Sequence, residues 1–236
     1  ANRIGYKGIC DKCERNCETP SECSKRNYSS DEYLKIPELF FQDDLSDKHT
    51  DYYAFIKDRL VCDAKSNEID AEILNILPHH IITTNYDNLL ETANSINTRL
   101  YTVVSEDRDL LSSANSRYIL KMHGDLKKEG TIVLKESDYI NYEHTHILIS
   151  TFIKSLLINH TFLFVGYSLN DYNLKLIIGW INYLANIYGI SDRPQNILIQ
   201  YNKATDSDIN YFKRRNINIV DLETMPTKLV ELANCH

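Results

Sequence analysis

Three short apolar runs in this chain each end in residues that could do chemistry. The runs end at Asn85, at His123, and at Gly166 with Ser168. A carboxamide can orient a water molecule or sugar hydroxyls without carrying a charge. A histidine, with an ordinary pKa of about 6.5, can accept a proton at neutral pH. Glycine and serine let a backbone and a hydroxyl approach a ribose or a phosphate. Brought together, these groups could position a nucleophile and remove its proton.

Each of the three segments has the form of a β-strand followed by a polar turn. They read HIITTNYD at 80–87, YILKMHGD at 118–125 and FLFVGYSLND at 162–171. Their apolar starts predict strands, and the first and third segments lead into helical patterns. Open α/β sheets bind ligands beyond the carboxyl ends of their strands. We therefore expect Asn85, His123 and the Gly166–Ser168 turn to meet at one edge of a sheet.

Strands and helices alternate along most of the chain after His80. The predicted strands lie near residues 80–84, 100–104, 118–122, 131–134, 161–165, 196–200 and 217–221. The predicted helices begin near Ser29 and then span 47–61, 69–77, 87–95, 136–142, 145–159, 171–187, 205–215 and 226–234. This alternation predicts a Rossmann-like α/β fold with a mostly parallel sheet and helices on both faces.

The length of 236 residues suits one sizeable domain. We expect a single domain over 1–236, with a cysteine-rich segment at 1–30, a helical segment at 31–77 and an α/β core at 78–236. The six aromatic residues of 31–61 could pack into the core, which is the simpler hypothesis, or against a second subunit.

In this order the three segments resemble the motifs of SIR2-like (sirtuin-related) NAD-consuming domains, in particular the bacterial defence-type NAD hydrolases. TTNYDNLLE at 83–91 is similar to the asparagine motif of that family, and KMHGDL at 121–126 to its catalytic histidine motif. FVGYSLND at 164–171 is similar to its late glycine–serine loop. One such motif would be weak, but three in the right order, each after a predicted strand, are fairly specific.

The resemblance implies that NAD⁺ is the substrate and that Asn85 and His123 are the catalytic pair. The residues implied to contact the ribose or phosphates are Thr84, Asp87, Gly166 and Ser168. Cleavage of the nicotinamide–ribose bond has an oxocarbenium-like transition state, as other glycosyl transfers do. The leaving pyridinium is already cationic and needs no general acid. The implied function is hydrolysis of NAD⁺ to nicotinamide and ADP-ribose, in bacterial antiphage defence.

Each of these residues also has a simpler interpretation. Asn85 and Gly166 could be ordinary turn residues, His123 a structural histidine, and Asp87 a helix N-cap. Two other functions also remain open. A lysine deacylase would use the same ribosyl chemistry, although deacylases usually have glutamine where this chain has Thr84. A non-catalytic module would bind NAD⁺ or ADP-ribose without releasing nicotinamide.

Relatives of this family open with a strand and a Gly-Ala-Gly-x-Ser loop that holds the dinucleotide phosphates. Before residue 124 the only glycines of this chain are Gly5 and Gly8, and they do not form such a loop. Because the later motifs are intact, we expect that the sequence begins after that loop, rather than that the loop has been lost.

Four cysteines lie close together in the first segment. They are spaced C-x2-C-x3-C-x5-C at Cys10, Cys13, Cys17 and Cys23. Four thiolates satisfy the ligand count of a structural zinc site, although the spacing departs from the paired motifs of zinc ribbons. Two local disulfides, free thiols and an iron–sulfur cluster are the alternatives.

Charge and hydropathy exclude several classes of partner. The formal net charge of −7 argues against a nucleic-acid-binding protein, which is usually basic along one face. No apolar stretch reaches the ~18 residues of a membrane span, and no signal peptide is visible. We therefore expect a cytoplasmic protein that contacts neither nucleic acid nor membrane directly. The family resemblance implies a homo-oligomer or a separate regulatory sensor, because unregulated NAD⁺ hydrolysis would be harmful.

Overall fold

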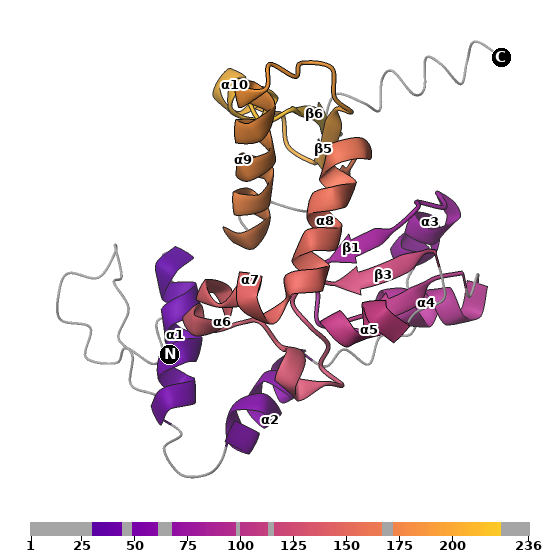
Figure 1. The fold of residues 1–236 in the computed structure, drawn as a ribbon. Helices are drawn as coiled ribbons and strands as arrows, with labels where there is room; N and C mark the ends of the chain where they lie inside the picture. The colour runs from indigo at the N-terminus through magenta and orange to yellow at the C-terminus, as the bar shows by residue number, and fades with distance from the viewer. Residues whose placement is uncertain are drawn as a thin grey trace. The chain divides into compact units, whose positions relative to one another are not determined.

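The computed structural model describes residues 30–43, 49–60, 68–97, 100–112, 116–166 and 172–222 (Figure 1). The chain divides into two compact units, Ala1–Ile149 and Ser150–His236. The cysteine cluster at 10–23, Ser168 and the predicted helix at 226–234 lie outside the described residues. The expectation of a single domain over 1–236 stays a prediction.

The first unit is built on a three-stranded parallel sheet. Its strands are β1 (Ile81–Thr83), β2 (Thr102–Val104) and β3 (Tyr118–Lys121), in the order β1-β3-β2. In the register of the sheet, Thr83 pairs with Lys121, and Val104 pairs with Leu120. The last three residues of β3 are buried, as expected for the central strand of a parallel sheet.

Helices α3 (Glu68–Asn75) and α4 (Leu89–Asn97) pack beside this sheet (Figure 1). Their apolar side chains meet those of the strands in one core cluster. Its buried members are Leu74, Ile81, Ala93, Tyr101 and Ile119. The short helix α5 (Asp107–Ser112), which the sequence periodicity does not predict, follows β2. The helices thus cover apolar residues of the sheet, and polar turns follow the carboxyl ends of its strands.

The aromatic helices of the first unit support the segment that follows β3. Helices α1 (Ser30–Asp43) and α2 (His49–Leu60) contribute aromatic rings, among them Tyr52, to a second core cluster. Leu126 and Ile132, from the segment after β3, lie in the same cluster. The ring of Tyr52 lies 5.6 Å from that of Phe40 and 5.2 Å from that of Phe41. Four of the six aromatic residues of 31–61 therefore pack into the core, as the simpler hypothesis predicts, whereas Tyr33 is exposed.

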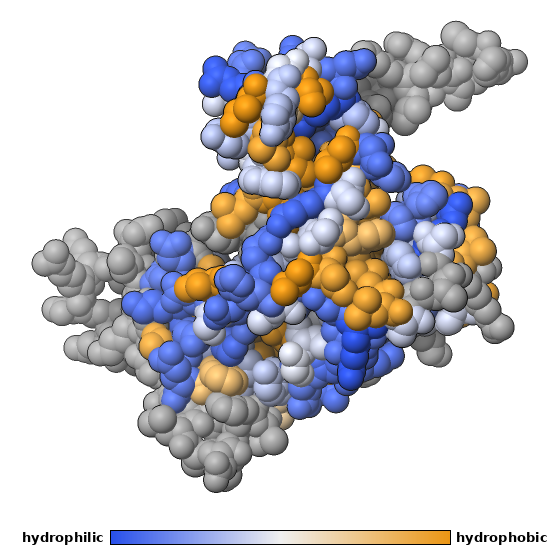
Figure 2. Space-filling model, viewed as in Figure 1, coloured by the Kyte–Doolittle hydropathy of each residue, from blue (hydrophilic) through white to orange (hydrophobic). Residues whose placement is uncertain are grey.

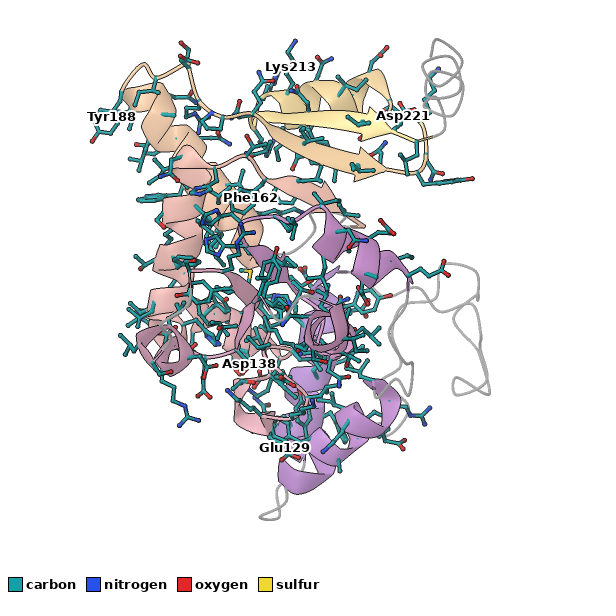
Figure 3. The ribbon with its side chains drawn as sticks, turned by 90° about the vertical axis from the view of Figure 1, so that its right-hand side faces the viewer. Glu129, Asp138, Phe162, Tyr188, Lys213 and Asp221 are labelled. Carbon is teal, nitrogen blue, oxygen red and sulfur yellow. The ribbon has the colours of Figure 1, made fainter. Side chains whose placement is uncertain are left out.

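The predicted strand at 131–134 is wrong. A 3₁₀ turn, η3 (Glu129–Thr131), and an extended stretch stand in its place, followed by α6 (Glu136–Ile140) and α7 (Tyr142–Thr145). The N–H of Val133 bonds to the carbonyl of His123, whereas the N–H of Leu134 bonds to the Asp138 carboxylate. The stretch therefore closes over the histidine turn instead of joining a sheet. Figure 3 labels Glu129 in η3 and Asp138 in α6.

The second unit contains another three-stranded parallel sheet. Its strands are β4 (Leu163–Val165), β5 (Asn196–Gln200) and β6 (Ile217–Asp221), in the order β4-β5-β6. The helices α9 (Tyr172–Ile187) and α10 (Asp206–Lys213) alternate with these strands. Lys213 ends α10 and Asp221 ends β6, as labelled in Figure 3. All strand pairs of both sheets are parallel, which confirms the predicted α/β class.

Helix α8 (Ile147–Asn159) begins in the first unit, where an aspartate caps it. The Asp107 carboxylate accepts bonds from the N–H groups of Leu148, at 2.9 Å, and Ile149, at 3.1 Å.

Helix α9 of the second unit has apolar side chains at its surface, among them Leu176 and Ile187, and Figure 2 shows apolar surface on the second unit. Of the helices in the described part of the chain, none has both the length and the apolar character of a membrane span.

Candidate active site

Asn85 and His123 occupy matching positions at the carboxyl edge of the first sheet. Thr83 and Lys121 are paired in the register of β1 and β3, and each candidate residue follows its strand by two positions. The N–H of Met122 donates to the carbonyl of Thr83 at 2.8 Å, which extends the contact beyond the paired residues. The two turns therefore leave the sheet side by side, whereas the Gly166 turn, predicted to meet them, follows β4 of a separate three-stranded sheet.

Asn85 is exposed and its backbone is fixed by its own strand. Its N–H donates to the Thr83 Oγ1 at 3.1 Å, a short-range bond typical of turns that follow a strand. Thr84, beside it, is partly buried. The backbone of the turn is thus held in place while the carboxamide of Asn85 lies at the surface, where a ligand can reach it.

His123 is buried and packed by aromatic side chains. Only 5% of its surface is exposed. Its ring lies 6.3 Å from the ring of Tyr86 and 5.4 Å, edge to face, from that of Tyr139. The Tyr86 hydroxyl donates to the Val133 carbonyl at 2.8 Å, and the Val133 N–H donates to the His123 carbonyl at 3.0 Å. These contacts fix both the ring and the backbone of the histidine.

Gly124 is required by the close approach of another part of the chain. Its φ is +88°, a conformation that side-chain-bearing residues rarely adopt. A Cβ atom at this position would lie 2.0 Å from the carbonyl oxygen of Thr131. The N–H of Asp125 donates to the Thr131 Oγ1 at 3.0 Å, so the two segments are bonded where they meet. The glycine of the histidine motif therefore has a defined structural role.

His146 lies in the surroundings of His123, and sequence reasoning assigns it no role. Its ring stacks on that of Tyr142, with centroids 4.4 Å apart, and the Tyr142 hydroxyl donates to the Met122 carbonyl. Burial lowers the pKa of His146, and the charge of His123 lowers it further, although Asp107 and Asp138 act in the opposite direction. A lowered pKa keeps the imidazole of His146 neutral at neutral pH.

The other implied ligand residues have different positions. Asp87 Oδ1 accepts the N–H of Leu89 at 3.1 Å, so its carboxylate caps α4. Gly166 lies in the second unit, directly after β4, with a φ of +62°, and a Cβ added to it would meet no described atom within 4 Å. Ser168 lies outside the described residues. Roles for Asp87, Gly166 and Ser168 in ligand binding stay predictions.

A buried lysine completes the surroundings of the two turns, and sequence reasoning does not identify it. Lys121 is the last residue of β3, and its side chain has no exposed surface. Its Nζ lies 2.6 Å from Glu91 Oε1 and 3.5 Å from Asp125 Oδ2. A lysine at the end of a buried strand is rare unless it is paired. Its position in the apolar run 118–122 is the sequence signal that could have identified Lys121 as a residue with a special role.

No cluster of histidine, cysteine, aspartate and glutamate side chains with the geometry of a metal site occurs within the described ranges. The four cysteines of the N-terminal segment fall outside those ranges. Zinc binding by Cys10, Cys13, Cys17 and Cys23 stays a prediction.

A second network of charged side chains joins the residues that follow β2 to Lys128, which lies beyond the histidine turn. Lys128 Nζ lies 2.9 Å from Glu106 Oε1 and 3.1 Å from Asp109 Oδ2. Burial raises the pKa of Asp109, but the bonds from the Ser105 N–H and from Lys128 outweigh it and hold that pKa below its ordinary value. A carboxylate whose pKa is depressed by folding stabilises the fold above its unfolded pKa, of about 3.9, and this contribution is lost as the pH falls through the folded pKa.

We therefore expect Asp109→Asn to lower the free energy of unfolding by about 2 kcal/mol at pH 7, because hydrogen bonds to a charged group are lost. This difference in unfolding free energy between the variant and the wild type should become smaller below pH ~4, where the carboxylate of the unfolded wild-type chain is protonated. Urea unfolding at a series of pH values measures both effects. A deficit that stayed constant as the pH fell would contradict the assignment to charge.

Comparison with known proteins gives a consistent result. The family model described as SIR2-like domain matches residues 79–220. Defense-associated sirtuin 2 of Bacillus subtilis is 35% identical over 204 residues, which cover 85% of this chain and 20% of that protein. NAD(+) hydrolase ThsA of Bacillus cereus (strain MSX-D12) is 30% identical over 191 residues, 75% of this chain and 39% of that protein. ThsA of Cytobacillus dafuensis is 34% identical over 130 residues, 54% of this chain and 26% of that protein. The chain thus spans well under half the length of these relatives.

Proposed function

The chain belongs to the SIR2-like domain family, and from this membership we propose that it hydrolyses NAD⁺ to nicotinamide and ADP-ribose. The observation that carries the proposal is the matched placement of Asn85 and His123, two residues beyond paired positions of β1 and β3. Relatives named NAD(+) hydrolase support the choice of reaction. The exposed carboxamide and the packed imidazole are the two groups that this reaction requires.

In the proposed reaction a water molecule attacks C1′ of the nicotinamide-bearing ribose. The bond between C1′ and the pyridinium nitrogen breaks, its electron pair returns to the ring, and nicotinamide leaves as a neutral molecule. The proton of the attacking water passes to the imidazole of His123. Asn85 orients the water or the ribose hydroxyls through its carboxamide, which carries no charge that would repel the pyrophosphate.

We also propose that this activity serves bacterial defence and that a second copy of the chain or a sensor protein controls it. The similarity to Defense-associated sirtuin 2 supports the biological role.

We propose that the ribose and phosphates of NAD⁺ are contacted by Thr84, Asp87, Gly166 and Ser168. Asp87 would do so with the carboxylate oxygen that does not cap α4.

Asn85→Ala is expected to reduce nicotinamide release from NAD⁺ by about 100-fold, because the nucleophile loses its orienting group. The measurement is nicotinamide formed by the wild type and the variant, with and without an acetyl-lysine peptide. The matched control is Asn141→Ala, which removes another exposed asparagine, one at the start of α7.

The two arms of that assay separate the candidate functions. Asn85-dependent release without peptide establishes the hydrolase. Release only with peptide identifies a deacylase, and binding of ADP-ribose without any release identifies a non-catalytic module. Full turnover by Asn85→Ala would contradict the assignment of this residue.

A further inference from the structure

Lys121 is a charged residue in a place where charge is unfavourable. It ends the central strand of the first sheet, and no part of its side chain is exposed. Burying an ammonium group is tolerated only where it is paired and its protons are hydrogen-bonded. An apolar side chain would fill this position without that penalty. The lysine must therefore be explained by what its charge holds together.

All three protons of the Lys121 ammonium are used. The Nζ atom donates to Glu91 Oε1 at 2.6 Å, to the carbonyl of Tyr86 at 3.2 Å, and to the carbonyl of Asp87. An ammonium has three protons to donate, so these bonds exhaust its capacity. The carboxylate of Asp125, at 3.5 Å, adds a second ion pair. One buried cation thus bonds or pairs with four groups from three stretches of the first unit, which are the Asn85 turn, helix α4 and the histidine turn.

The lysine and its partners lie close in sequence to both candidate catalytic residues. Tyr86 and Asp87 directly follow Asn85, whereas Lys121 and Asp125 lie two residues before and two residues after His123. The carbonyl of Tyr86 also accepts the N–H of Leu126 at 3.3 Å, so the two turns are bonded to each other at the same atom. The loss of the ammonium would therefore remove contacts from both turns.

We propose that Lys121 is the positioning residue of this site. Its buried ammonium holds the Asn85 turn against the His123 turn, and Glu91 of α4 holds the ammonium. The expected loss of kcat rests on the proposed function, whereas the expected loosening of the two turns does not. Lys121 is buried and touches neither substrate nor reacting atoms. It acts through the two backbone carbonyls that fix the direction of the chain after Asn85.

The test compares the isosteric substitution Glu91→Gln with Glu106→Gln. Glu106 is also a partly buried glutamate paired with a lysine, Lys128, at 2.9 Å, so the control removes the same charge from the other network. Glu91→Gln is expected to lower kcat for nicotinamide release about tenfold, and Lys121→Met about 100-fold, with KM little changed, because misplaced groups lose rate rather than binding. Glu106→Gln should keep the wild-type kcat.

Lys121→Met is at risk of unfolding because Glu91 loses its partner, so hydrogen exchange on Glu91→Gln supplies a readout independent of activity. Peptides covering 84–88 and 122–126 should exchange faster together in this variant and stay unchanged in Glu106→Gln. Unchanged exchange in both peptides, or faster exchange in one alone, would overturn the proposal. So would a wild-type kcat in Glu91→Gln. If the wild-type chain released no nicotinamide, the proposed hydrolase would fail, and the exchange result alone would still decide the role of Lys121.

Discussion

His123→Ala is expected to abolish nicotinamide release, with a loss of about 1,000-fold or more, while the fold is retained. The imidazole is the proposed acceptor of the proton from water, and a positioned general base contributes roughly 100- to 10,000-fold. The ring packs edge to face on Tyr139, and its removal leaves the backbone bond from Val133 in place. Release is measured directly as nicotinamide formed, beside a thermal unfolding curve.

The matched control is His144→Ala. His144 lies exposed on α7, in the same unit as His123. Its loss should leave nicotinamide release and stability as they are in the wild type. Turnover by His123→Ala at the wild-type rate would remove the histidine from the mechanism. Equal losses in both histidine variants would point to a general effect on the unit rather than to the chemistry.

Gly124→Ala is expected to destabilise the first unit by roughly 3 kcal/mol or more. The added Cβ would sit 2.0 Å from the Thr131 carbonyl oxygen, and the φ of +88° would be strained for alanine as well. Each of these effects alone typically costs about 1–3 kcal/mol. Relief of the contact requires the Thr131 segment to move away from the histidine turn. Both stability and nicotinamide release should therefore fall.

Alanine substitutions at two other glycines separate the effect of the close contact from the effect of the backbone conformation. Gly130 has no described atom within 4 Å of an added Cβ and no positive φ, so Gly130→Ala should change stability by less than about 0.5 kcal/mol. Gly189 has a φ of +65° and similarly open surroundings, so Gly189→Ala reports the backbone cost alone, of about 1 kcal/mol. Urea unfolding of the three variants gives the comparison. A stability of Gly124→Ala equal to that of Gly189→Ala would mean that the contact with Thr131 is absent in solution.

The parts of the fold that depend on local pattern could be predicted from the sequence. The apolar runs before Asn85 and His123 are strands β1 and β3, and parallel pairing follows from the helices between strands. The simpler interpretation of Asp87 as a helix cap also agrees with its bond to Leu89. Helix α10 starts where Thr205 and Asp208 form a capping box, a signal that is readable in the sequence.

The parts that depend on distant contacts could not be predicted. Ile132 and Val133 look like a strand, but burial against the aromatic helix α2 and a bond to His123 satisfy them without one. Helix α5 begins at Asp107, whose carboxylate caps α8 about 40 residues later, and no local pattern encodes that contact. The role of Lys121 could not be predicted for the same reason, because its partner on α4 comes from a different stretch of chain.

The order of strands in the first sheet has a consequence for how this unit folds during synthesis. The ribosome completes β1 and β2 before β3, yet among the described strands these two bond β3 and not each other. Both pairings must therefore wait until the chain beyond Tyr118 has emerged, and the β1–β3 pairing closes a long loop, a slow step in folding. Asn85 and His123 become neighbours in that same step. A nascent chain that ends before β3 thus holds neither the sheet nor the neighbouring placement of Asn85 and His123, and both arise together with the folded unit.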